Sequence, residues 1–173
     1  ALTIRRYEDG LASSYMHTKR PGDEVTIGPI EGNLTLVDPD RDVGFLASGT
    51  GITPLLSILR QYLRDGNGHA HVVFGETREE TIIHRETLNE LAANHPNLDV
   101  TITLSDPNWE WTGRAGYVQD HLENLFEDTE ARDFYICGVP PMVVDTKTKL
   151  RDLGTPAERI HSEGWEDEVV DDS

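Results

Sequence analysis

VGFLASGTGITP, residues 43–54, carries more information about the fold than any other stretch. A short apolar segment suited to a buried strand runs into a turn with glycines at positions 49 and 51, and the turn opens a helix. Pro54 takes the place of the third glycine of an ordinary dinucleotide fingerprint, and a proline in a first helical turn loses no hydrogen bond. Such a turn lets backbone N–H groups and a helix N-terminus face a pyrophosphate without Cβ atoms in the way. The stretch therefore predicts a dinucleotide site, although a strand-to-helix turn that binds nothing has the same pattern.

The rest of the chain alternates between short apolar segments and helical periodicity. We expect strands at residues 43–47, 71–74, 100–104, 134–137 and 159–162, and helices near 54–64, 85–94, 117–126 and 141–153. This alternation predicts an α/β fold with a doubly wound, five-stranded parallel sheet. Upstream of the polar segment 38–42, residues 2–7, 24–30 and 33–37 have β character, with a helical turn at 13–17.

Three blocks of the sequence fall just after expected strands. The glycine turn follows the first strand, Cys137 and Gly138 follow the fourth, and Glu163 follows the fifth. Ligands of doubly wound sheets bind beyond the carboxyl ends of the strands, so these blocks are expected to converge on one site.

The composition is strongly acidic, with 32 Asp and Glu against 15 Lys and Arg and a net charge of −17. A compact domain with this charge repels itself in dilute buffer, whereas molar salt shortens the screening length to about 3 Å. The composition therefore favours a halophilic source, with an ordinary acidic cytosolic protein as the alternative. Because phosphate neutralisation needs clustered Lys and Arg, we expect no nucleic-acid partner.

The single cysteine excludes an internal disulfide, a thiolate-bound iron–sulfur centre and a structural zinc site. The histidines share no metal-ligand spacing, so no metal site is expected. Residues 43–59 approach the length of a membrane span, but the glycine turn explains them better. With no signal peptide in view, the protein is expected to be cytoplasmic and to have no membrane partner.

The glycine turn and three other blocks together resemble the ferredoxin–NADP reductase family of flavin oxidoreductases. The other blocks are GLASSYMH at 10–17, FYICGVPPM at 134–142 and IHSEGW at 160–165. The resemblance implies FAD and NAD(P)H as cofactors, hydride transfer between them, and electron exchange with a redox protein such as ferredoxin, flavodoxin or a partner oxygenase. It also implies that residues 1–38 are a partial antiparallel FAD-binding β-barrel and residues 39–173 an NAD(P)-binding domain.

One feature of the family is missing from the sequence. The Arg-x-Tyr-Ser/Thr strand that grips the flavin is not found, because the stretch from Arg5 to Glu8 lies too close to Gly10 and lacks the hydroxyl residue. A non-catalytic nucleotide-binding or electron-transfer subunit without its own flavin is therefore the alternative function.

The resemblance assigns site residues by position. The flavin pyrophosphate would lie at Gly10, Ala12 and Ser13. The nicotinamide cofactor would be bound by Gly49, Thr50, Gly51, Thr53, Pro54, Arg78, Gly138, Pro140 and Met142. Replacing Gly51 by valine is expected to remove nucleotide binding while leaving the fold intact.

The catalytic residues implied by the resemblance are Cys137, Glu163 and Trp165. The thiol would align the nicotinamide ring, the carboxylate would relay a proton or orient the thiol, and the indole would cover the flavin. The alternatives are a buried apolar cysteine and one more surface acid.

The choice between NADH and NADPH depends on the loop after the second strand. An acidic residue there favours a free ribose 2′-hydroxyl, an arginine can hold a 2′-phosphate, and the loop contains both Glu76 and Arg78. Asp106 would repel an extra phosphate, so the sequence favours NADH. A surface ion pair is the alternative role of Arg78.

Overall fold

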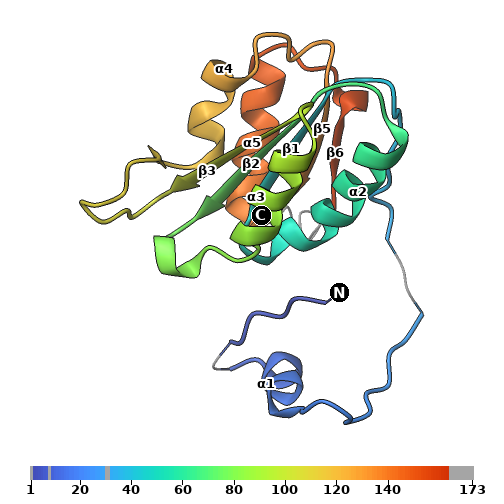
Figure 1. The fold of residues 1–173 in the computed structure, drawn as a ribbon, viewed down its shortest axis with the longest axis vertical. Helices are drawn as coiled ribbons and strands as arrows, with labels where there is room; N and C mark the ends of the chain where they lie inside the picture. The colour runs from blue at the N-terminus through green and yellow to red at the C-terminus, as the bar shows by residue number, and fades with distance from the viewer. Residues whose placement is uncertain (1, 8, 30–31, 164–173) are drawn as a thin grey trace, which may run out of the picture.

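A six-stranded parallel sheet forms the centre of the molecule (Figure 1). The structure is a computed structural model that describes residues 2–7, 9–29 and 32–163. The strand order is β4-β3-β2-β1-β5-β6. The strands are β1 (Val43–Ser48), β2 (Ala70–Glu76), β3 (Leu98–Leu104), β4 (Arg114–Ala115), β5 (Asp133–Cys137) and β6 (Ile160–Ser162). The predicted α/β fold is confirmed, and β4 is an additional strand that pairs with the end of β3.

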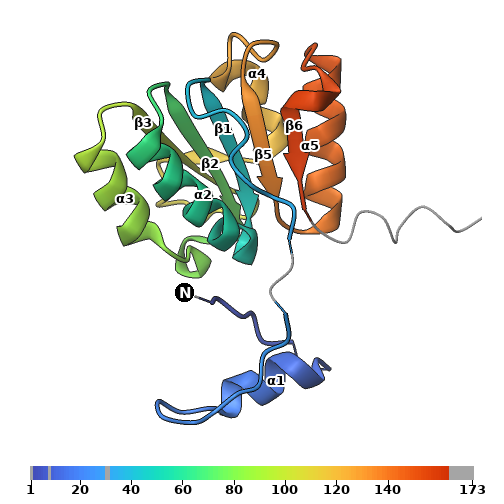
Figure 2. The same ribbon diagram turned by 90° about the vertical axis from the view of Figure 1, so that its right-hand side faces the viewer.

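Helices cover both faces of the sheet (Figure 2). One face carries α2 (Ile52–Asp65) and α3 (Arg85–Asn94), and the other carries α4 (Leu122–Leu125) and α5 (Pro140–Asp152). Short 3₁₀ turns are η1 (Gly49–Gly51), η2 (Glu79–Thr81), η3 (Val118–His121) and η4 (Ala157–Arg159). The helix expected at 117–126 is thus divided into η3 and α4, and the Asp120 carboxylate caps the first turn by accepting the Tyr117 N–H at 2.8 Å.

Alternation along the inner strands builds two apolar clusters. In β1, Phe45 packs into the cluster beneath α2 and α3, while Leu46 packs into the cluster beneath α4 and α5. Gly44 has no side chain because the Phe134 ring lies where its Cβ would be, with atoms 2.5 Å from that position. Burial on both faces explains why these strands read as continuous apolar runs.

The direction in which the chain adds strands to the sheet reverses at β1, which pairs with β2 on one side and with β5 on the other. The chain proceeds outward from β1 through β2 and β3, and then returns to β5 and β6. This arrangement makes the carboxyl ends of β1 and β5 the switch point of the fold, where doubly wound proteins bind their ligands.

The segment before β1 differs from the expected partial barrel. It contains α1 (Leu11–Thr18), which lies away from the sheet (Figure 1), and none of the described residues before Val43 pairs as a strand. The strands expected at 2–7, 24–30 and 33–37 are therefore wrong for this structure, in which the described parts of these segments find no neighbouring strand to complete a ladder. Within the described ranges, no helix has the length and apolar character needed to cross a membrane.

Candidate functional site

An open cleft with a cavity volume of about 130 Å³ lies at the carboxyl edge of the sheet. Its walls come from the ends of β1, β2 and β3 and from the loops around β4 and β5. The residues that line it are Arg5, Ser48, Gly49, Gly75, Glu76, Thr77, Ser105, Gly116, Tyr117, Val118, Val139 and Met142. The predicted nucleotide residues Gly49 and Met142 are thus brought together, as the topology requires.

Gly49 presents bare backbone to this cleft. It has a φ of +53°, and a Cβ at this position would meet no atom within 4 Å. The adjoining 3₁₀ turn leads directly into α2, whose N-terminus carries partial positive charge. Among the described residues, the buried Thr53 Oγ1 has no hydrogen-bond partner. Open backbone at a helix N-terminus suits an anionic phosphate group.

Gly51 has a packing role that the sequence motif did not predict. A Cβ there would lie 2.2 Å from the Cys137 carbonyl oxygen and 2.6 Å from the Gly138 nitrogen. This glycine therefore lets the loop after β1 pack directly on the loop after β5. The expectation that Gly51→Val leaves the fold intact is wrong, because the valine would collide with backbone.

The loop after β5 is fixed by a second contact to β1. The Val139 N–H donates to Ser48 Oγ at 3.1 Å, and a Cβ on Gly138 would lie 2.3 Å from the same oxygen. Cys137 lies partly buried at the end of β5, and Pro140 begins α5. The predicted nicotinamide residues after β5 thus stand beside the predicted pyrophosphate turn.

Glu76 and Arg78 point to different places. Glu76 lines the cleft, burial raises the pKa of its carboxyl, and Thr81 Oγ1 donates to it at 3.2 Å. Arg78 instead forms an ion pair with Asp106, with Nη2 and Nε at 2.8 Å and 2.9 Å from Oδ2. Arg78 thus adopts the surface ion pair that was the alternative to phosphate binding.

The remaining predicted residues lie apart from the cleft or outside the described chain. Gly10, Ala12 and Ser13 are at the start of α1, where Ser13 Oγ accepts the Tyr7 N–H and donates to the Gly10 carbonyl. Pro54 is exposed in the first turn of α2. Trp165 lies outside the described residues.

Sequence reasoning missed Ser48 and Tyr117. Ser48 ends β1 immediately before the glycine turn, so its place in the motif was visible. Tyr117 follows β4, and its side chain is 60% exposed while lining the cleft. An exposed aromatic ring at the wall of a cleft offers a face on which a nucleotide base can stack.

Comparison with known proteins fits this geometry. The profile of the Oxidoreductase NAD-binding domain family matches residues 45–148, from β1 into α5. The chain is also 36% identical to Ferredoxin--NADP reductase B of Sorangium cellulosum over an alignment of 176 positions, which covers 95% of the chain and 71% of that protein. The chain belongs to the oxidoreductase NAD-binding domain family.

Two further similar proteins show how much of a relative's length the chain covers. It is 32% identical to NADH-cytochrome b5 reductase 1 of Debaryomyces hansenii, covering 88% of the chain and 56% of that protein. Among solved structures, the CS-b5R domains of human Ncb5or in the NAD+ form share 31% identity, with a TM-score of 0.84, over 92% of the chain and 47% of theirs. The chain therefore spans about half to 71% of the length of these three proteins.

Proposed function

We propose that this chain is the nucleotide-binding part of a flavin-dependent oxidoreductase that passes hydride between NAD(P)H and FAD. The observation that carries the proposal is the cleft at the switch point, where the bare backbone of Gly49 and the start of α2 meet the loop after β5. The Sorangium and Debaryomyces relatives are named as NADP and NADH reductases, which supports a nicotinamide cofactor here.

The residues present fit such a cofactor. The backbone of Gly49 and the N-terminal turn of α2 that follows it would bind the pyrophosphate, and Met142, which lines the cleft, would lie near the nicotinamide together with the preceding Gly138 and Pro140. The nicotinamide and flavin would supply the hydride chemistry, while the protein aligns the rings and excludes water. Cys137, Glu163 and Trp165 remain the residues proposed to serve hydride transfer, the first and the last of them as groups beside the reacting rings.

The position of Arg78 supports NADH as the cofactor. Its guanidinium is neutralised by Asp106, whereas Glu76 lines the cleft and can accept hydrogen bonds from a ribose diol. Breaking the ion pair with Asp106→Ser would leave Arg78 available to a 2′-phosphate. We expect this variant to improve the Kd of NADPH relative to that of NADH.

Residues 1–38 would form one part of a flavin-binding barrel. Their exposed apolar side chains, including Leu11 at 91% and Ile27 at 72%, support packing against further β structure. The competing function, a nucleotide-binding subunit without flavin, is favoured by the local hydrogen bonds of Ser13 and by the lack of paired strands among described residues 2–29. An absorption spectrum of the purified protein with added FAD separates the two functions.

The electron partner would be a small redox protein. The two reductase relatives are named for ferredoxin and cytochrome b5, and flavodoxin or a partner oxygenase would fit the same reaction. Reduction of each candidate carrier by the chain loaded with FAD and supplied with NADH tests this choice.

Nucleotide binding is tested with a matched pair of glycine substitutions. Gly49 and Gly22 both have positive φ, at +53° and +98°, and neither would bring a Cβ within 4 Å of another atom. Asparagine tolerates this backbone region, so both variants should fold. Gly49→Asn places an amide in the cleft and should weaken NADH binding at least tenfold, while Gly22→Asn should bind normally. Equal affinity in both variants would refute the assignment of the cleft.

A further inference from the structure

Residues 33–41, here called the strap, lie on the face of the sheet that carries α2 (Figure 2). Leu34 and Leu36 of the strap pack against the apolar cluster on this face. The strap therefore belongs physically to the nucleotide-binding half, although most of it lies before the domain boundary expected between residues 38 and 39.

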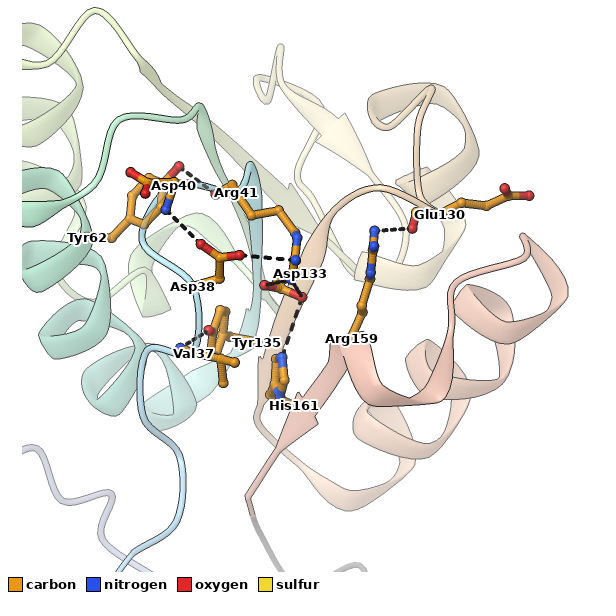
Figure 3. A network of polar contacts seen from close by, with 10 residues as sticks. All are labelled: Val37, Asp38, Asp40, Arg41, Tyr62, Glu130, Asp133, Tyr135, Arg159 and His161. Carbon is orange, nitrogen blue, oxygen red and sulfur yellow. Dashed lines mark hydrogen bonds and ion pairs between the residues drawn. The ribbon is translucent and has the colours of Figure 1, made fainter.

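Polar contacts hold the middle and the end of the strap (Figure 3). The Val37 N–H donates to Tyr135 Oη at 2.8 Å. Tyr135 is fully buried, with its ring stacked between Phe45 and His161 at centroid distances of 5.4 Å and 4.8 Å. This hydrogen bond therefore anchors the strap to a rigid aromatic column.

The end of the strap is held by charge. Arg41 Nη1 donates to both oxygens of Asp133, at 3.1 Å and 2.9 Å, and Arg41 Nη2 lies 3.0 Å from Asp38 (Figure 3). The Asp133 side chain is only 1% exposed, so its charge needs this partner.

Glu163 holds the start of the strap. Its Oε1 accepts the Asn33 N–H at 3.2 Å and its Oε2 accepts the Leu34 N–H at 3.3 Å. Glu163 follows β6 directly, so these bonds join the carboxyl edge of the sheet to a segment 130 residues earlier in the chain. A carboxylate that receives two successive backbone N–H groups is a charge-assisted contact of the kind that fixes loops.

We propose that Glu163 is a positioning residue, called the latch below, whose two hydrogen bonds fix the start of the strap. It thereby sets where the chain before residue 33, which belongs to the proposed flavin-binding half, leaves the nucleotide-binding half. The boundary between the two halves then falls before residue 33 instead of at 38–39. Its effect on hydride transfer rests on the proposed function, because misplacing the segment before residue 33 would move the flavin relative to the nicotinamide. The latch itself is a property of this chain and needs neither cofactor.

Amide hydrogen exchange tests the latch directly. Glu163→Ala should speed exchange of the Asn33 and Leu34 amides about tenfold, since both lose their acceptor. Glu163→Gln keeps one acceptor oxygen and should restore part of the protection. Glu158→Ala, an exposed acid in η4, is the matched control and should leave both amides at the wild-type rate. Wild-type exchange at both amides in Glu163→Ala would overturn the proposal.

A second variant tests whether Glu163 affects hydride transfer by positioning the strap or by relaying a proton. Tyr135→Phe removes the acceptor of the Val37 N–H at the middle of the strap and keeps the aromatic ring. In protein loaded with FAD, both Tyr135→Phe and Glu163→Ala should lower the limiting rate of flavin reduction with little change in the Kd of NADH. The double variant should lose less than the product of the two single effects. A wild-type rate in Tyr135→Phe would overturn the positioning role, and failure of NADH to bind at all would refute the proposed function while leaving the exchange result to judge the latch.

Discussion

Two regions of the molecule, the described parts of residues 2–29 and residues 43–163, differ in how far their apolar side chains are buried. Among the described residues 2–7 and 9–29 none is buried, and Leu2 and Leu11 are 74% and 91% exposed. Residues 43–163 place their apolar side chains in two clusters, one on each face of the sheet. A short segment cannot build a core of its own, so the first region depends on contacts with other structure, whereas the second is stabilised by its own packing.

The two regions also differ in charge. Residues 1–29 contain four basic and four acidic residues, so the entire net charge of −17 falls on residues 30–173. Self-repulsion therefore acts on the part of the molecule that has the core. The following substitutions pair a site in the core region with a similar site in residues 2–29.

The largest contrast is expected from truncating a leucine. Leu46→Ala removes a fully buried side chain and should lower the free energy of unfolding by about 2–5 kcal/mol. Leu11→Ala should change it by less than about 0.5 kcal/mol, because Leu11 is 91% exposed. Urea unfolding of both variants measures the difference, and equal losses would show that the first region is packed in solution.

Acid stability should depend on a histidine in the core. Burial lowers the pKa of His71 from 6.5 to about 4. Between pH 4 and pH 6.5 the unfolded chain therefore binds a proton at this residue that the folded chain does not. The free energy of unfolding has its full value above pH 6.5 and decreases as the pH falls towards 4. The loss reaches about 3 kcal/mol at most.

Two histidine variants measured by unfolding at pH 7 and pH 4.5 check this dependence. His71→Gln should flatten the acid side of the stability curve, because glutamine does not titrate. His17→Gln, at an exposed position in α1, is the control and should keep the wild-type curve. An unchanged curve in His71→Gln would contradict the role of burial.

Glycine substitutions give the next contrast. Gly51→Ala should destabilise the fold by about 1–3 kcal/mol, since the new Cβ would overlap the Cys137 carbonyl group. Gly28→Ala meets no atom within 4 Å and should be close to neutral. Thermal unfolding distinguishes them, and a neutral Gly51→Ala would mean that the loops after β1 and β5 are not in contact in solution.

Salt should have the smallest effect. Raising KCl from about 0.1 M to above 1 M should increase the melting temperature by a few degrees, because repulsion among the acidic side chains of residues 30–173 is screened. Replacing Glu90, Glu110 and Glu158 by glutamine should reduce this slope. A flat or falling curve for the unaltered chain would refute the halophilic interpretation.

The sequence predicted the elements whose apolar pattern is continuous. The helix expected at 85–94 coincides with α3, and all of the expected strands from residue 43 onward are present. β4 was missed because it is only Arg114–Ala115 and contains no apolar run. The β pattern of residues 2–7 was misleading, because alternation alone forms no ladder when no neighbouring strand is available.

The candidate site was predicted in position but not in detail. The topology brings the loops after β1 and β5 together, which the strand assignment had implied. The contact of Gly51 with Cys137, the pairing of Arg78 with Asp106, and the hydrogen bonds of Glu163 to the strap all join segments far apart in the chain. Such contacts depend on the packed geometry and leave no local signal in the sequence.

The lengths of the outer strands bear on how the protein resists aggregation. The sheet is bordered by β4, with two residues, and by β6, with three, whereas the four inner strands have five to seven. A short border strand exposes few unpaired backbone groups, and Arg114 adds a charge on one border. The apolar inner strands are therefore shielded from edge-to-edge pairing between copies, and deletions that remove β4 or β6 should promote aggregation before they abolish the fold.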